Sequence, residues 1–144
     1  LESPALWNEI KAGQEPFQTV LCLDVLEHLV DPWTAVQRCR ELLAPGGALI
    51  VSIPNARNFR LTFPLFFLGK FELRQSGIRD RTHLRWFVRK TAIELVSQDG
   101  FELEACEGGW YRNTGRKIER LANYGIFPGF FYLNYFVKAR KVSN

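Results

Sequence analysis

Short apolar runs alternate with helical patterns along much of this chain. Four runs of aliphatic and aromatic residues, bounded by acids or turn residues, predict strands at 17–24, 48–53, 101–106 and 130–139. Two segments with apolar residues at helical spacing predict helices at 32–43 and 89–99. The first two strands are almost continuously apolar, which is typical of strands buried on both faces of a parallel sheet. The strand–helix–strand order over 17–53 therefore predicts a right-handed βαβ unit and an α/β fold.

Three stretches interrupt this order. The sequence APGG at 44–47 predicts a turn before the second strand. Residues 56–88 mix aromatic side chains with bases, and we expect a cap-like insertion there, with one or two short helices broken at Pro64 and Gly69. A polar, basic stretch further along predicts a loop followed by a short helix at 116–122.

The composition is that of one globular domain covering residues 1–144. The chain is 47% hydrophobic and 24% charged, which excludes a disordered or collagen-like protein. Its longest apolar stretches, 61–68 and 126–137, are shorter than the roughly 18–20 residues of a membrane-spanning helix, so we expect a cytoplasmic protein. The three cysteines are far apart and lack CxxC spacing, so the sequence predicts neither a disulfide framework nor a zinc site.

The net charge of +4 conceals an uneven distribution. Residues 1–31 hold six acids and one base, whereas residues 57–90 hold nine bases and two acids. Residues 63–68 are too apolar for a solvated phosphate-binding face, so we expect no nucleic-acid partner. The basic, aromatic segment predicts instead a cap over a small-molecule or lipid-like acceptor of anionic character, or a surface for peripheral membrane contact. Core packing with a charged rim is the alternative.

Three sequence blocks carry a family resemblance. LCLDVLEHLVDP at 21–32, LLAPGGALIVSIPN at 42–55 and DRTHLRWF at 80–87 resemble the class I S-adenosylmethionine-dependent methyltransferases, in the branch of the ubiquinone-biosynthesis O-methyltransferases. The resemblance extends from about residue 17 to residue 141. It implies a Rossmann-like sheet of order 3-2-1-4-5-7-6 with strand 7 antiparallel and helices on its faces. The four expected strands match strands 4, 5, 6 and 7 of that sheet.

The glycine-rich part of the family's pattern is missing from this sequence. None of the eleven glycines forms GxGxxG, and the acid that ends strand 2 and holds the cofactor's ribose hydroxyls has no counterpart. The chain is therefore expected to be the C-terminal portion of a methyltransferase that uses S-adenosylmethionine, inactive by itself. The rival hypothesis is a non-catalytic remnant that acts as an interaction module. The strand at 19–23 would be an uncovered apolar edge, which predicts a homodimer or another partner along it.

The resemblance assigns roles to residues that follow the first expected strand. Leu23, Asp24 and Val25 lie at its carboxyl end, where open α/β sheets bind ligands, and the resemblance implies that they contact the cofactor. His28 is a candidate catalytic base, with a local structural hydrogen bond as the alternative. An acid-x-x-Glu-His arrangement in this branch resembles a divalent-cation site, but two acids and one imidazole are too few ligands to assign a metal.

A second group of candidates follows the second expected strand. Asn55 ends that strand and is expected to face the acceptor. His83 is a second candidate base, and Arg81 and Arg85 beside it can hold a carboxylate or phosphate through paired hydrogen bonds. The alternative is a lid held by salt bridges, with the neighbouring aromatic residues in the core.

The missing glycine motif leads to a testable prediction. Glycines let backbone amides approach a bound cofactor closely, and a strand-end carboxylate accepts both ribose hydroxyls. This chain of 144 residues is therefore expected to bind S-adenosylmethionine weakly or not at all by itself. Isothermal titration calorimetry measures this directly, and a micromolar dissociation constant for the chain alone would contradict the prediction.

Overall fold

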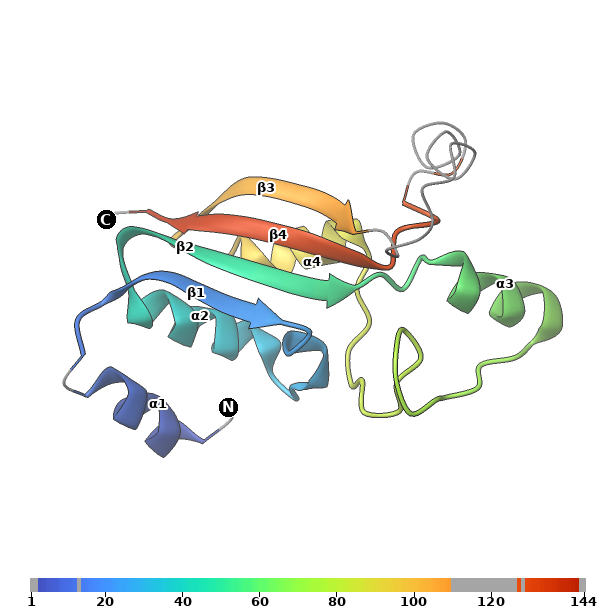
Figure 1. Ribbon diagram of the computed structural model, residues 1–144, viewed down its shortest axis with the longest axis horizontal. Helices are drawn as coiled ribbons and strands as arrows, with labels where there is room; N and C mark the ends of the chain where they lie inside the picture. The colour runs from blue at the N-terminus through green and yellow to red at the C-terminus, as the bar shows by residue number, and fades with distance from the viewer. Residues whose placement is uncertain (1–2, 13, 110–126, 128, 143–144) are drawn as a thin grey trace.

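Four strands form one mixed sheet in the order β1-β2-β4-β3 (Figure 1). The computed structural model describes residues 3–12, 14–109, 127 and 129–142. The strands are β1 (Phe17–Leu23), β2 (Leu43–Pro54), β3 (Phe101–Gly109) and β4 (Asn134–Lys141). β1 and β2 are parallel, and β4 is antiparallel to both β2 and β3. This confirms the expected order 4-5-7-6 with an antiparallel last strand.

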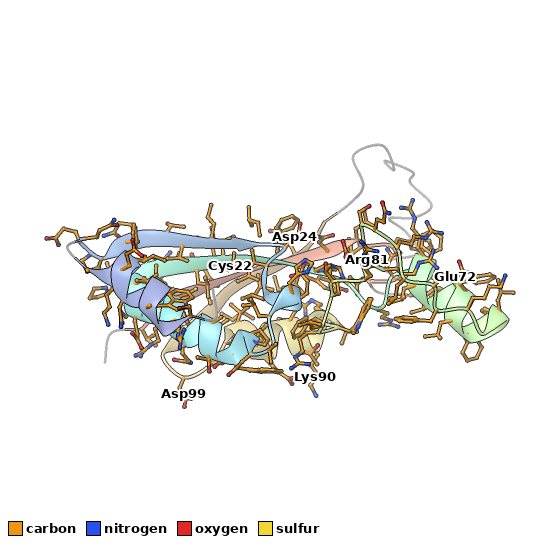
Figure 2. The ribbon with its side chains drawn as sticks, turned by 90° about the horizontal axis from the view of Figure 1, so that it is seen from below. Cys22, Asp24, Glu72, Arg81, Lys90 and Asp99 are labelled. Carbon is orange, nitrogen blue, oxygen red and sulfur yellow. The ribbon has the colours of Figure 1, made fainter. Side chains whose placement is uncertain are left out.

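The helices divide into a layer on the sheet and one that projects from it. α1 (Pro4–Lys11), α2 (Pro32–Leu42) and α4 (Arg89–Val96) lie on one face of the sheet, as Figure 2 shows in side view. α3 (Phe59–Leu68) lies beyond the end of the sheet, and the segment between α3 and α4 returns toward the strand ends (Figure 1). No helix in the described ranges is long and apolar enough to cross a membrane.

The core lies between the sheet and the α2–α4 layer. Val36 of α2 and Leu95 of α4 are buried there against strand residues such as Leu49 and Val137, which are fully buried. Asp31 fixes the start of α2, because its carboxylate accepts hydrogen bonds from the Thr34 backbone nitrogen at 3.0 Å and hydroxyl at 2.6 Å. This capped start and the following proline agree with the expected helix.

The opposite face of the sheet carries exposed apolar side chains. Leu21 and Leu23 of β1 are 59% and 50% exposed, and Phe136 of β4 is 44% exposed. Leu23 aligns with Ser52, which aligns with Phe136, so these side chains share one face. β1 is an edge strand in the described sheet, as the resemblance implies. Its apolar pattern predicts burial on both faces, and this is wrong for the described residues, because no element covers the face that carries Leu21 and Leu23.

The turn expected at 44–47 is instead the beginning of β2. The pairing of β1 with β2 shifts register between Phe17 and Thr19, so a bulge takes up the extra residues of β2. Gly46 adopts a left-handed φ of 73° in this stretch, which glycine does without steric cost. The bulge lets strand pairing continue through a sequence that is typical of a turn.

The break expected at Pro64 does not occur, and α3 is one helix. Asn58 caps its start by accepting a hydrogen bond from the Arg60 backbone nitrogen at 3.0 Å, and Gly69 ends it at φ 60°, as expected. Proline removes one helical hydrogen bond. Because most of α3 faces solvent, water can satisfy the carbonyl group that loses its donor.

The other element boundaries differ by a few residues. α4 ends at Val96 rather than at the expected Asp99, β3 extends to Gly109, and β4 begins at Asn134. The pattern does not predict α1 or the short 3-10 helix η1 (Leu26–His28), because so few residues carry little periodic signal. The helix expected at 116–122 lies outside the described residues.

Burial within α3 leads to a prediction about its two faces. Leu61 is 4% exposed, whereas Phe66 on the same helix is 82% exposed. Leu61→Ala is expected to lower the free energy of unfolding by about 2–5 kcal/mol, because it removes buried methyl groups and leaves a cavity. Phe66→Ala is the matched control and is expected to change it by less than about 0.5 kcal/mol. Urea denaturation followed by circular dichroism measures both, and equal losses would refute this division.

Candidate functional site

A pocket of 550 Å³ lies at the end of the sheet where β1 and β2 finish and β4 begins. Residues from η1, α3 and the segment after α3 complete its wall. The polar and charged residues among its lining are Asp24, Glu27, His28, Arg60, Arg74, Ser76, Arg79, Asp80, His83 and Asn134. The pocket therefore joins the carboxyl ends of two parallel strands with the basic segment that the sequence predicts to be a cap.

Asp24 connects three strands at the floor of this pocket. One oxygen of its carboxylate accepts hydrogen bonds from the Ser52 hydroxyl on β2 at 2.6 Å and from the Asn134 amide on β4 at 2.8 Å. Its backbone φ is 52°, a left-handed conformation that is rare outside glycine and costs energy. That conformation turns the chain out of β1, and the two hydrogen bonds hold the carboxylate in place.

Glu27 is a buried carboxylate in the wall of this pocket. Its side chain is 1% exposed, and within the described residues neither carboxylate oxygen has a hydrogen-bond partner. Burial disfavours the charged form and raises the pKa of Glu27 to about 7. Its backbone carbonyl accepts hydrogen bonds from the backbone nitrogens of Leu84 and Arg85, at 2.8 and 3.0 Å. These bonds hold residues 80–87 against η1.

Two imidazole rings face that carboxylate. The Nε2 atoms of His28 and His83 lie 4.0 and 3.9 Å from Glu27 Oε1, and the ring centroids are 4.7 Å apart in an edge-to-face arrangement. Burial, with the charge of neighbouring His28 as a smaller cause, lowers the pKa of His83. A neutral His83 can therefore accept a proton from a bound group.

The hydrogen bonds of His28 define its tautomer. Its Nδ1 atom lies 3.1 Å from the Thr82 carbonyl oxygen and 3.0 Å from the Thr82 hydroxyl, which donates its own hydrogen to Asp80. A carbonyl oxygen only accepts, so Nδ1 carries the hydrogen and Nε2 keeps its lone pair in the neutral ring. That lone pair belongs to the nitrogen that faces Glu27.

These three side chains can hold a divalent cation. One oxygen of Glu27 and one nitrogen from each of His28 and His83 lie within 4.8 Å of one another. A buried carboxylate without a donor and two imidazoles form a donor set of the kind that binds transition metals and zinc. The donor set therefore fits the cation site that the resemblance implies, and the third ligand, His83, comes from a distant segment.

The structure brings only some of the predicted site residues together. Asp24, His28 and His83 line the pocket. Leu23 is half exposed and lies on the open face of the sheet, and Val25 is partly buried; neither lines the pocket. The predicted cofactor contacts of Leu23, Asp24 and Val25 remain predictions.

The residues predicted to bind the acceptor lie outside the pocket lining. Asn55 is fully buried, and its amide donates to the carbonyl oxygens of Gly129 and Tyr132 at 2.7 and 2.9 Å. Arg85 donates a hydrogen bond to the Val30 carbonyl oxygen, and Arg81 does not line the pocket. These contacts give Asn55 and Arg85 a structural role in the described fold.

Sequence reasoning missed several residues that do line the pocket. Asn134 begins the last strand, where no motif marks it, and Arg74 and Arg79 were indistinguishable from the other bases of the cap. The sequence marks Glu27 only as part of an acid-x-x-Glu-His arrangement. The burial of Glu27 and the approach of His83 depend on the position of residues 80–87, which the local sequence does not specify.

Comparison with known proteins agrees with the fold. The model of a methyltransferase domain family matches residues 3–105. A ubiquinone biosynthesis O-methyltransferase of Cereibacter sphaeroides is 48% identical over 111 residues, covering 70% of this chain and 44% of that protein. A protein of the same name from Xanthomonas euvesicatoria is 30% identical over 115 residues, covering 76% of this chain and 47% of that protein. The chain thus spans about half the length of these relatives.

Solved structures show the same fold. A SAM-dependent methyltransferase from Methanosarcina mazei has a TM-score of 0.59 at 16% identity, covering 89% of this chain and 60% of that one. A SAM-dependent methyltransferase from Thermotoga maritima has a TM-score of 0.55, also at 16% identity, and the match covers 90% of this chain and 57% of that one. The fold is the Rossmann-like fold of S-adenosylmethionine-dependent methyltransferases. The chain belongs to the methyltransferase domain family.

The burial of Glu27 leads to a prediction about pH. Because its pKa is raised from 4.5 to about 7 in the fold, the folded protein binds more protons than the unfolded chain between those values, and stability falls as pH rises through them. The Glu27→Gln variant has no ionisable group at this position, so its free energy of unfolding does not fall for this reason. The free energy of unfolding of the variant minus that of the parent is therefore expected to increase from about pH 5 to pH 8, by on the order of 1–3 kcal/mol.

Urea denaturation in the presence of a chelator measures this difference without bound cations. Glu104→Gln is the control, because hydrogen bonds from Arg140 and Lys138 lower the pKa of Glu104. Its contribution to stability is lost only at more acidic pH, so this variant should differ from the parent by a constant amount over the same range. Parallel pH profiles for the two variants would show that burial of Glu27 has no such cost.

Proposed function

We propose that this chain provides the acceptor side of an S-adenosylmethionine-dependent O-methyltransferase. The observation that carries the proposal is the convergence of Glu27, His28 and His83 in a pocket at the carboxyl end of β1. Ligands of open α/β sheets bind at that end of the strands. The Cereibacter and Xanthomonas relatives are named for O-methylation in ubiquinone biosynthesis, which supports a hydroxyl group on a small molecule as the methyl acceptor.

The imidazoles would remove the proton from that hydroxyl. S-adenosylmethionine, when bound, supplies an electrophilic methyl group. We propose that Leu23, Asp24 and Val25 contact this cofactor. His28 or His83, in the neutral form, would accept the proton of the acceptor hydroxyl group, whose oxygen would take the methyl group as the bond from that methyl group to the cofactor's sulfur breaks. Holding the acceptor in line with the methyl group supplies the larger part of the rate enhancement.

A cation held by Glu27, His28 and His83 would act on the same hydroxyl. Its charge would polarise the oxygen and lower the pKa of the hydroxyl group. The carboxylate of Glu27 would then have the charged partner that the described residues do not give it. Under either arrangement, the acceptor oxygen lies next to the two histidines.

The cap supports a lipid-like acceptor and contact with a membrane surface. Phe63, Phe66 and Phe67 of α3 are 51%, 82% and 65% exposed, and basic residues precede and follow the helix. Exposed aromatic side chains with neighbouring bases favour an anionic lipid interface or an apolar ligand tail. Pairing of two copies along β1 is a further proposal, supported by the exposed Leu21 and Leu23 on that edge strand.

Substitution of the histidines tests the proposed chemistry. In the longest natural reading frame that contains these residues, His28→Asn and His83→Asn are each expected to lower kcat by about 10²–10⁴-fold, because each removes a proton acceptor or a ligand at the acceptor oxygen. Mass spectrometry of the methylated product measures the rate. Lys90→Gln, on the exposed surface of α4 (Figure 2), is the control.

Two outcomes would contradict this mechanism. Unchanged turnover in the doubly substituted protein would remove the histidines from the chemistry. Absence of methyl transfer in the parent reading frame, together with tight binding of another macromolecule, would favour the non-catalytic interaction module instead.

A further inference from the structure

Two arginines of the pocket, Arg74 and Arg79, differ from its two aspartates in one respect. Oδ1 of Asp24 accepts hydrogen bonds from Ser52 and Asn134, and Oδ1 of Asp80 accepts hydrogen bonds from the Thr82 nitrogen and hydroxyl at 2.8 and 2.6 Å. Within the described residues, by contrast, neither Arg74 nor Arg79 has a carboxylate within 4.0 Å. Arg74 and Arg79 therefore line the pocket without an ion pair to any carboxylate of the described residues.

A tight turn holds these two arginines in register. The Arg74 nitrogen donates to the Arg79 carbonyl oxygen at 2.7 Å, and the Arg81 nitrogen donates to the Arg74 carbonyl oxygen at 2.9 Å. Gly77 closes the turn with φ 79° and accepts a hydrogen bond from the Asp80 nitrogen. Both arginine side chains thus begin from a fixed backbone, which lowers the entropy cost of placing them around a ligand.

We propose that Arg74 and Arg79 form a subsite for a carboxylate or phosphate group of a small-molecule ligand. A guanidinium group donates two parallel hydrogen bonds to either anion, and two such groups surround it more completely than one. Oδ1 of Asp24 and Oδ1 of Asp80 already accept hydrogen bonds within the protein, and among the described residues neither carboxylate forms an ion pair with Arg74 or Arg79. The role expected for Arg81 and Arg85 thereby passes to two arginines that line the pocket.

The subsite gives the pocket two chemically different ends. The histidines and Glu27 accept protons or a cation, whereas Arg74 and Arg79 accept an anion. A ligand with a hydroxyl group at one end and a negative charge at the other would bind in a single orientation. This last step rests on the proposed function, but binding of the anion does not.

Calorimetry with simple anions tests the subsite. Benzoate and inorganic phosphate are titrated into the 144-residue chain at low ionic strength, with benzyl alcohol as the uncharged counterpart of benzoate. The parent is expected to bind both anions more tightly than benzyl alcohol. Arg74→Gln with Arg79→Gln is expected to weaken anion binding at least about tenfold and to leave benzyl alcohol unaffected, because only charge-assisted hydrogen bonds are lost.

Two control variants separate the subsite from general charge. Arg81→Gln lies in the same turn but outside the pocket, and Lys90→Gln removes one charge from α4. Both are expected to bind the anions as the parent does. Arg74→Lys with Arg79→Lys is expected to recover only part of the affinity, since lysine keeps the charge but not the paired geometry. Circular dichroism confirms that each variant folds.

The remaining outcomes overturn the proposal. No anion binding by the parent at millimolar concentration, or equal losses in Arg81→Gln, would refute the subsite. Vesicles of phosphatidylglycerol form a separate arm: if the double glutamine variant loses vesicle binding but still binds benzoate and phosphate, the arginines serve a lipid headgroup surface instead. None of these measurements requires methyl transfer, so failure of the proposed catalysis would be seen separately in the histidine variants.

Discussion

The buried carboxylate of Glu27 is the constraint on which the rest of the site depends. A carboxylate removed from water and left without a donor is costly, so it requires a proton or a positive partner. Two imidazole nitrogens face it from segments 55 positions apart in the chain, His28 and His83. The backbone carbonyl of the same residue holds Leu84 and Arg85. The Glu27 side chain thus requires a proton or a positive partner, and its backbone carbonyl holds in place the segment that carries His83.

The scaffold beneath the site is regular. The parallel pair β1 and β2, the capped helix α2 and the core contacts of Leu49 and Val137 follow ordinary rules of patterning and burial. That regularity places the ends of three strands side by side, and Asp24 joins them through Ser52 and Asn134. The polar network can therefore be well positioned although it lies at the rim of a small sheet.

Sequence reasoning predicts the part of this molecule that periodicity and motif order encode. The four strands, two of the helices and the unusual antiparallel position of β4 follow from such signals and from the family resemblance. The pairing of His83 with Glu27 does not, since it depends on where residues 56–88, a segment without clear periodicity, return to the sheet. The same holds for Arg74 and Arg79: the sequence shows many bases, and only the turn at Gly77 selects these two for the pocket.

Departures from the usual rules of folding occur at two places and differ in kind. Around the pocket they are polar: a left-handed Asp24, a buried Glu27, and Arg74 and Arg79, which form no ion pair with a carboxylate of the described residues. Glu27 favours a proton or a cation, and the two arginines favour an anion. On the open sheet face they are apolar: Leu21 and Leu23 are exposed, and any hydrophobic surface that excludes water from them would be bound favourably. Selectivity for a ligand must therefore come from the pocket, whereas the sheet face can contribute stability on contact but little chemical discrimination.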